Sequence, residues 1–243
     1  MHHTPDFIKL LAPDLRWQIV QTLKRGDYRV SELVAALGRP KNLLSYHLKQ
    51  LRAEAIITYR RSDADRRDYY YSLNIPRLQA LYRQAGQELN IRVADASPIY
   101  RWTPPVRVLY LCTRNSARSQ MAEGLLRHMG GENVRVYSAG SEPAFVHPLA
   151  VQVMSERGID IHHHESNHLD EFVGQAFDYV ITVCDHVREV CPTFPGVLEH
   201  HWSFADPAIV DETSQLDAFR QTAEGLAERI AYFMALIDTE RRR

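Results

Sequence analysis

Residues 109–120 read LYLCTRNSARSQ and mark a change from one kind of secondary structure to another. The apolar run that begins at Val106 and ends at Cys112 predicts a short buried strand, and from Ala117 onward the apolar residues recur at helical spacing. Cys112 therefore falls just before a helix N-terminus, where converging amides and the helix dipole favour a thiolate. Arg118 can clamp a tetrahedral oxyanion from the same loop. The stretch predicts a nucleophile facing an oxyanion.

Further apolar runs follow this stretch and alternate with helical patterns. The predicted strands are Val106–Cys112, Asn133–Ala139, Asp178–Cys184 and Val197–Trp202, and the predicted helices cover 117–128, 147–157 and 214–237. This alternation predicts an α/β domain with a parallel four-stranded sheet and helices on both faces. Sites in such sheets lie at the carboxyl ends of the strands, where both Cys112 and Cys184 fall.

The whole chain of 243 residues is divided by charge and by a proline-rich segment. Residues 1–95 hold 16 Lys and Arg against 10 Asp and Glu, a net of +6, whereas residues 96–243 hold 13 against 20, a net of −7. A basic half suggests a polyanionic partner such as nucleic acid. Three prolines interrupt the periodicity near residue 100, so we place a linker at 93–105, between a domain at 1–92 and a domain at 106–243.

All three cysteines, Cys112, Cys184 and Cys191, lie in the second half. An odd number of cysteines without a secretory leader favours redox, catalytic or metal chemistry over a disulfide framework. The sequence shows no leader and no apolar run of membrane-spanning length, so we expect a cytoplasmic protein.

The first half shows two helical patterns joined by a tight turn and followed by a hairpin. Residues 5–25 are helical in pattern and Pro13 splits them; Ser31 is a candidate N-cap for the next helix, and Gly38 ends it. A helix from Pro40 and a polar-tipped hairpin complete an α+β winged helix-turn-helix. The residues expected to contact DNA lie on that helix and on the hairpin: Lys41, Asn42, Ser45, Tyr46, His47, Lys49, Arg60, Arg61, Arg66 and Arg67.

The segments SELVAALG and SYHLKQLRAEAII, followed by the hairpin, resemble the winged-helix regulators of the arsenic-repressor family over about residues 5–90. The resemblance implies binding to operator DNA and a homodimer, in which a helix at 77–89 pairs with the first helix. Sensors of this family often carry a thiol pair in or beside the helix-turn-helix, whereas residues 1–92 contain no cysteine. We therefore expect any inducer signal to enter through the second domain or through another ligand.

CTRNSARS fits the C-x5-R-[ST] loop shared by low-molecular-weight tyrosine phosphatases and thioredoxin-coupled arsenate reductases. In VCDHVREVCPTFPG, Cys184 and Cys191 stand seven positions apart, and HWSFADPA places Asp206 before a proline. Phosphatases of this fold lack the cysteine pair and usually have an aromatic residue after the Asp-Pro, where this chain has Ala208. The sequence therefore resembles the reductases more closely, over about residues 105–237.

The resemblance implies thioredoxin-coupled reduction of arsenate to arsenite, with thioredoxin as electron donor. Cys112 would form the covalent adduct and Asp206 would protonate the departing hydroxide. Cys184 would then attack Cys112, and Cys191 would attack Cys184 and carry the disulfide to thioredoxin. The predicted substrate-binding residues form the loop itself: Thr113, Arg114, Asn115, Ser116, Ala117, Arg118 and Ser119.

Some reductases of this family hold a potassium ion beside the loop. Asn115, Glu123 and Ser138 match positions used for that ion, and Asn167 stands at the fourth, where a carboxylate is usual. We predict no other bound cofactor, and the spacing of Cys184 and Cys191 is not a usual zinc-ligand spacing.

The same residues are compatible with two other functions. The loop could serve a low-molecular-weight phosphatase-type hydrolase, because phosphate and arsenate are nearly isosteric. Alternatively, the cysteine domain could be the sensor of a transcription regulator that responds to arsenite or to oxidation.

Overall fold

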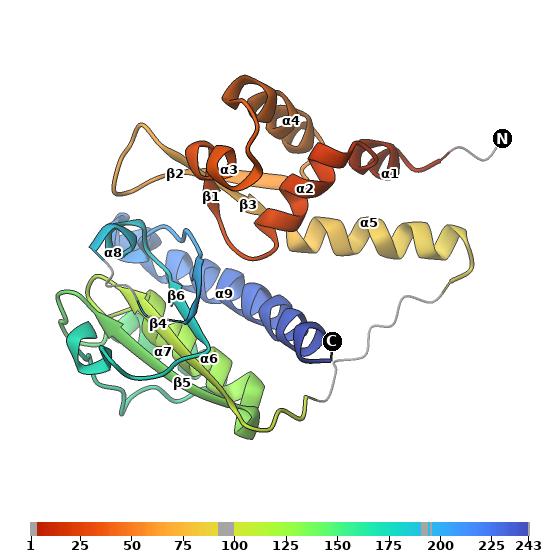
Figure 1. Ribbon diagram of the computed structural model, residues 1–243. Helices are drawn as coiled ribbons and strands as arrows, with labels where there is room; N and C mark the ends of the chain where they lie inside the picture. Colours follow the sequence, from red (N-terminus) through yellow and green to blue (C-terminus); the bar gives the residue numbers. More distant parts are fainter. Residues whose placement is uncertain (1–3, 92–99, 191–193, 195, 243) are drawn as a thin grey trace. The chain divides into compact units, whose positions relative to one another are not determined.

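The structure, a computed structural model, describes residues 4–91, 100–190, 194 and 196–242. The chain divides into two compact units, residues 1–98 and 99–243 (Figure 1). The second unit includes residues 100–105, which the sequence placed in the linker. Trp102 is buried there: its amide donates to Asn133 Oδ1 at 2.8 Å and its indole N–H donates to Asp238 Oδ1 at 3.2 Å. The rest of the predicted linker, residues 93–99, lies outside the described residues.

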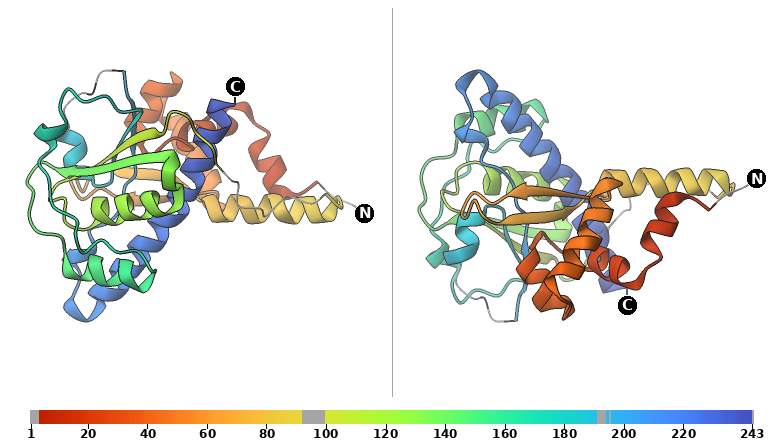
Figure 2. Two further views of the ribbon diagram at one scale, coloured as in Figure 1. Left: turned by 90° about the horizontal axis from the view of Figure 1, so that it is seen from below. Right: turned by 90° about the horizontal axis from the view of Figure 1, so that it is seen from above.

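Unit 1 has five helices and three short strands among its described residues. They are α1 (Asp6–Leu11), α2 (Asp14–Leu23), β1 (Tyr28–Arg29), α3 (Val30–Leu37), α4 (Lys41–Ala53), β2 (Ile57–Arg61), β3 (Tyr69–Leu73) and α5 (Ile75–Glu88). Pro13 separates α1 from α2, as its fixed φ and missing N–H require. The strands form an antiparallel sheet in the order β1-β3-β2, and the right view of Figure 2 shows the β2–β3 hairpin reaching beyond the helices of this unit.

Helices α3 and α4 form the helix-turn-helix. Gly38 ends α3 with φ +61°, a left-handed conformation that suits glycine, and Leu44, Leu48 and Leu51 bury one face of α4. The start of α3 differs from the sequence prediction. The helix begins at Val30, and the Glu32 carboxylate accepts the backbone N–H of Arg29 at 2.7 Å, so Ser31 lies inside the first turn and is not the N-cap.

Unit 2 contains a four-stranded sheet in the order β5-β4-β6-β7, with all neighbouring pairs parallel. Its strands are β4 (Val106–Cys112), β5 (Val134–Gly140), β6 (Tyr179–Thr182) and β7 (Leu198–His201). Its α-helices are α6 (Arg118–Gly130), α7 (Pro148–Glu156), α8 (Asp185–Val190) and α9 (Glu212–Arg241), and its 3-10 helices are η1 (Gly131–Asn133), η2 (Leu169–Phe172) and η3 (Pro207–Ile209). The predicted winged helix-turn-helix and parallel four-stranded sheet are both confirmed.

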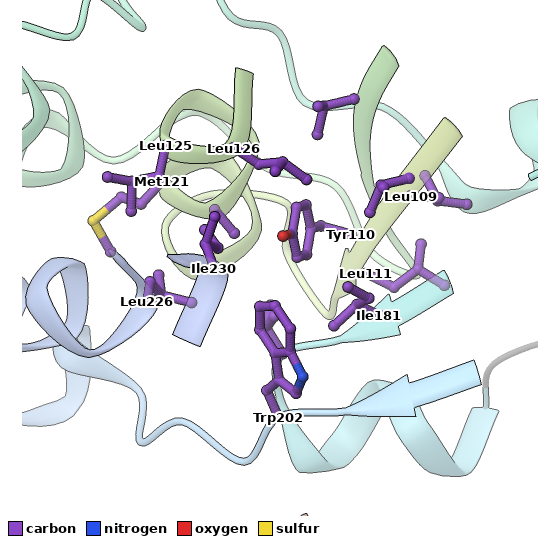
Figure 3. Close-up of a cluster of buried hydrophobic side chains, with 14 of the residues drawn as sticks. Leu109, Tyr110, Leu111, Met121, Leu125, Leu126, Ile181, Trp202, Leu226 and Ile230 are labelled. Carbon is purple, nitrogen blue, oxygen red and sulfur yellow. The ribbon is translucent and has the colours of Figure 1, made fainter. Parts of the chain in front are cut away.

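The sheet of unit 2 is covered differently on its two faces. On one face α6 lies between the sheet and α7 (Figure 2, left view), and Figure 3 shows Tyr110 pointing from β4 toward side chains of α6 and α9, beside Trp202. The ring centroids of Tyr110 and Trp202 are 5.7 Å apart. On the other face Tyr137 packs against Phe172 and Phe177, which lie in and just after η2. Phe172 thus comes from η2, a four-residue 3-10 helix, whereas the sequence predicted only that helices lie on both faces.

No helix among the described residues is both long enough and apolar enough to cross a lipid bilayer.

Candidate active site

Cys112 is the last residue of β4, and the loop that follows curls around its sulfur. The backbone N–H of Asn115 donates to Cys112 Sγ at 3.1 Å, and Ser119 Oγ lies 2.9 Å from the same sulfur. Asn115 has φ +45°, one of the few non-glycine residues in the left-handed region, and this conformation turns its amide inward. The loop therefore offers hydrogen-bond donors to a negatively charged sulfur and to an anion in front of it.

The direction of these amides is fixed from outside the loop. The carbonyl oxygens of Thr113, Arg114 and Ser116 accept backbone N–H groups from the segment after β5, which come from Glu142 (2.8 Å), Ala144 (3.0 Å) and His147 (2.9 Å). The Asn115 carbonyl likewise accepts from Gln120 Nε2 at 3.0 Å and Ser166 Oγ at 2.7 Å. Because the carbonyls point outward to these donors, the N–H groups are left to face the pocket.

Gly140, at the end of β5, touches the loop backbone directly. A Cβ atom at this position would lie 2.5 Å from the Thr113 carbonyl oxygen and 2.8 Å from the Asn115 nitrogen. Since both atoms belong to the backbone, the loop itself would have to move. Glycine at this position lets β5 and the loop approach so closely.

Arg118 begins α6 and its guanidinium is nearly buried. Nη1 donates to the Phe204 carbonyl at 2.8 Å, and Nη2 donates to Asp206 Oδ2 at 2.8 Å. The other Asp206 oxygen accepts the N–H of Ala208 at 3.0 Å. The structure thus brings together the two residues that the sequence assigned to oxyanion binding and to proton donation.

Cys184 lies two residues beyond β6, next to the loop. The Val183 amide donates to the Leu111 carbonyl at 2.8 Å, which holds this segment beside the end of β4. Thr113 Oγ1 is 3.3 Å from Cys184 Sγ. Burial raises the pKa of the Cys184 thiol above its ordinary value, although the Arg118 guanidinium and the Thr113 hydroxyl act in the opposite direction.

Cys191, the third cysteine of the predicted relay, lies outside the described residues. Helix α8 begins directly after Cys184 and ends at Val190. His186 and Glu189 of α8 line a cleft of roughly 630 Å³ that also contains Cys112, Arg118 and Asp206. The cleft is therefore bounded on one side by the helix that joins the two predicted relay cysteines.

His147 also lines this cleft, although it was not predicted from the sequence. Its Nδ1 accepts the N–H of Leu149 at 3.2 Å, so its side chain caps the N-terminus of α7, and its ring packs 4.6 Å from that of Phe219. Burial lowers the pKa of this imidazole below its ordinary value, against the opposing influence of the Asp206 carboxylate. The following residue, Pro148, is a usual first residue of a helix and could have indicated a capping role.

The residues that match a potassium site do not fit a bound cation. Asn115 Oδ1 accepts hydrogen bonds from Gln120 Nε2 (3.1 Å) and from the Asn167 amide (2.8 Å), and Ser138 Oγ accepts from Asn115 Nδ2 at 2.8 Å. The Glu123 carboxylate is ion-paired with the guanidinium of Arg127. The Asn115 and Ser138 oxygens are thus already engaged, and a positive charge of the chain stands beside the Glu123 carboxylate.

In unit 1, the face of α4 opposite its buried leucines is polar and open. Lys41, Asn42, Ser45, Tyr46 and Lys49 are exposed and His47 is half-buried. The exposed side chains point away from buried Leu44 and Leu48, whereas Nδ1 of His47 is buried. The arrangement suits a helix that enters the major groove of DNA.

The four predicted arginines of the hairpin differ in their contacts. Arg60 donates to Asp63 at 2.8 Å, and Arg67 makes a two-pronged contact with Asp65, with Nη2 at 2.7 Å from Oδ2. Arg61 and Arg66 are exposed, and the Arg61 guanidinium lies 5.6 Å from the centre of a tyrosine ring on β3. Ion pairs within the hairpin partly neutralise its basic tip.

The site and sheet define a class: an α/β domain with a cysteine at the end of a strand and an arginine at the start of the next helix. The chain belongs to the low molecular weight phosphotyrosine protein phosphatase family, whose model matches residues 107–243. Residues 14–59 match the model of the bacterial regulatory proteins of the arsR family.

Several curated proteins are similar to the second half of the chain. An arsenate reductase of Halalkalibacterium halodurans is 42% identical over 129 residues, which cover 52% of this chain and 93% of that protein. Arsenate reductase 2 of Staphylococcus saprophyticus is 39% identical over 127 residues, which cover 52% of this chain and 94% of that protein.

Among solved structures, a thioredoxin-dependent arsenate reductase of Corynebacterium glutamicum is 24% identical, with 92% of this chain and 98% of that chain covered and a TM-score of 0.48. An arsenate reductase in the phosphate-binding state is 32% identical, with 54% of this chain and 98% of that chain covered and a TM-score of 0.47.

Proposed function

We propose that the protein reduces arsenate to arsenite with a thiol relay and carries a DNA-binding domain of the arsenic-repressor type. The observation that carries the enzymatic part is the position of a second buried thiol, Cys184, beside the loop of Cys112, with the Thr113 hydroxyl 3.3 Å from its sulfur. Hydrolysis of a phosphate ester needs one nucleophilic cysteine, whereas a two-electron reduction needs two thiols. The curated relatives named above, which this chain matches over nearly their whole length, are named arsenate reductases.

In the first step the Cys112 thiolate attacks the arsenic atom of arsenate. A sulfur–arsenic bond forms, the bond from arsenic to one hydroxyl group breaks, and that hydroxyl leaves as water after it takes a proton from Asp206. The loop amides and Arg118 bind the remaining oxygens. In this step Arg118 exchanges its contact with the Asp206 carboxylate, 2.8 Å long, for contacts with the oxyanion, which frees the carboxyl group to act as the acid.

In the second step the Cys184 thiolate attacks Cys112 Sγ. The Cys112–Cys184 disulfide forms, the sulfur–arsenic bond breaks, and its electron pair stays on arsenic, which leaves as arsenite. Cys191 then attacks Cys184, which restores the Cys112 thiolate and moves the disulfide to the Cys184–Cys191 pair. A dithiol of thioredoxin reduces that pair and is itself oxidised.

Arsenate-dependent oxidation of NADPH in the presence of thioredoxin and thioredoxin reductase tests this proposal. We expect sustained turnover by the purified protein. The Cys191→Ser variant should release one arsenite per enzyme and then stop, because its disulfide is not passed on. Unimpaired turnover by this variant would contradict the relay. No turnover by the fully reduced wild-type protein, together with efficient aryl phosphate hydrolysis by a Cys184→Ser/Cys191→Ser variant, would support a phosphatase instead.

We also propose that unit 1 binds operator DNA as a dimer. The exposed polar face of α4 supplies base and phosphate contacts, and the hairpin reaches the backbone through Arg61 and Arg66. Dimerisation through α1 and α5 is part of this proposal, and exposed Ile8 and Tyr82 lie on these helices. Binding to the DNA upstream of the protein's own gene, with and without arsenite, tests it. Affinity that falls with arsenite would assign a sensing role to the cysteines of unit 2.

A further inference from the structure

Arg52, in the last turn of α4, is directed toward the hairpin of unit 1. It stands three positions after Lys49 and seven after Ser45, so the helical period places it on the polar face of α4 that is proposed to contact DNA. Its guanidinium carbon, however, lies 3.5 Å from the centre of the Tyr59 ring on β2. The planar cation is thus stacked on the ring and joins the helix to the hairpin.

Tyr59 is the first member of a row of side chains along one face of the hairpin. It pairs with Tyr71 across the two strands, with ring centroids 6.2 Å apart, and its ring lies 5.5 Å from that of Tyr69. The Arg61 guanidinium lies 5.6 Å from the centre of the Tyr69 ring. Cross-strand aromatic pairs of this kind stabilise hairpins. The row therefore connects the end of α4 to Arg61, which is proposed to reach the DNA backbone.

The turn between α4 and β2 is short but unfavourable for its residues. Ala55 has φ +53°, a left-handed conformation that alanine adopts only at an energetic cost. The amides of Ala55 and Ile56 donate to the carbonyls of Arg52 and Leu51, each at 3.0 Å. Because the turn itself is strained, contacts outside it have to hold the angle between helix and hairpin. The contact of Arg52 with Tyr59 spans this turn directly.

The other face of the hairpin is held by a different arginine. Arg29 donates to Asp68 Oδ2 at 3.2 Å, and its guanidinium lies 5.7 Å from the centre of the Tyr70 ring. This contact acts on β3 and its approach, whereas Arg52 acts on β2. The hairpin reaches beyond the helices of its unit (Figure 2, right view), and two short strands alone are only marginally stable. The two arginines hold different strands on opposite faces, so neither replaces the other.

We propose that Arg52 is a positioning residue for DNA binding: stacked on Tyr59, it fixes the hairpin at one angle to α4, so that Arg61 and the polar face of α4 meet the duplex together. Without the stack the hairpin adopts several angles, and its ordering then opposes binding. The inference rests on the proposed binding of DNA by unit 1, and it gives Arg52 no contact with a phosphate.

The affinity of the full-length protein for a 20-base-pair duplex of random sequence, measured over a range of salt concentrations, tests this proposal. Tyr59→Leu removes the ring but no charge, and it should weaken binding about fivefold with the salt dependence of log K unchanged. Tyr59→Phe keeps the ring and is the matched control, so it should bind as the wild type does. Arg52→Met should weaken binding by a similar factor. The double variant Arg52→Met/Tyr59→Leu should be no weaker than Arg52→Met, because both changes remove one contact.

Amide hydrogen exchange without DNA measures the hairpin directly. Exchange in residues 57–61 and 69–73 should be faster in Tyr59→Leu and Arg52→Met than in the wild type and Tyr59→Phe, and melting temperatures show whether the variants stay folded. Wild-type affinity in Tyr59→Leu, a salt dependence lowered by about one in Arg52→Met, or additive losses in the double variant would each overturn the proposal. A wild-type protein that does not bind the duplex would instead refute DNA binding by unit 1, and this proposal with it.

Discussion

The Arg118 guanidinium and the Asp206 carboxylate are joined at 2.8 Å across the mouth of the Cys112 loop. The two residues are far apart in the sequence and belong to α6 and to the segment before η3. The pair couples oxyanion binding to proton donation, since Arg118 must turn from the carboxylate to the oxyanion for both to act.

Replacing the acid should therefore affect the chemical step more than binding. We expect Asp206→Asn to lower kcat for arsenate about a hundredfold, since an amide cannot protonate the departing oxygen. Single-turnover formation of the Cys112 adduct measures this step directly. Glu212→Gln, a change at an exposed carboxylate at the start of α9, is the control. A rise in KM with an unchanged kcat would instead assign Asp206 to substrate binding.

The buried thiol of Cys184 should make arsenite release depend on pH. Because burial raises the pKa of this thiol, only a small fraction is thiolate at neutral pH, and the rate of arsenite release in a single turnover should rise as the pH increases from 7 to 9. Thr113→Val removes a hydrogen bond that favours the thiolate and should move this profile to higher pH. A profile that falls with pH, or one that Thr113→Val leaves in place, would contradict this role.

Gly140→Ala should displace the anion loop, because the added Cβ would lie 2.5 Å from the Thr113 carbonyl oxygen. We expect a loss of about 2 kcal/mol in the free energy of unfolding. We also expect phosphate to inhibit arsenate reduction at least tenfold more weakly. Gly158→Ala is the comparison. Gly158 has φ +72° and open space around its Cα, so alanine should lower the stability of the protein but leave inhibition by phosphate unchanged. Equal phosphate inhibition in both variants would refute the steric argument.

Potassium should have no specific effect on this protein. Arg127 neutralises Glu123, and the amide oxygen of Asn115 is already hydrogen-bonded. We expect the melting temperature to be the same within about one degree in KCl and in choline chloride of equal ionic strength, because no bound cation contributes to the folded state. A saturable rise of the melting temperature with KCl would show a cation site.

The exposed lysine of α4 should contribute electrostatically to DNA binding. Lys49→Ala should weaken binding to a 20-base-pair duplex of random sequence and reduce the salt dependence of log K by about one. Gln50→Ala, a neutral change at the neighbouring position, should leave the salt dependence unaltered. If Lys49→Ala leaves both quantities unchanged, α4 is not the helix that contacts DNA.

The sequence allowed the loop to be located because its signals are local: an apolar run, a cysteine, small polar residues and a helical pattern follow one another within β4 and α6. The first residue of α3 was harder to place, because the Glu32 side chain supplies the cap that was expected of Ser31. Contacts such as His164 with Arg127 join elements that are distant in the chain, and neither residue has a pattern that indicates the other. Such partners depend on how α6 packs against β5 and against the segment that precedes η2.

The segment that holds the anion loop from outside does so through its main chain. The amides of Glu142, Ala144 and His147 make the contacts, so the side chains at the first two positions are not required for them. Substitutions other than proline at these two positions can therefore change the rim of the cleft. The main-chain hydrogen bonds that hold the anion loop would keep their geometry. The side chains at the rim, which contact a substrate's outer part, can thus change independently of the loop that holds the reacting cysteine.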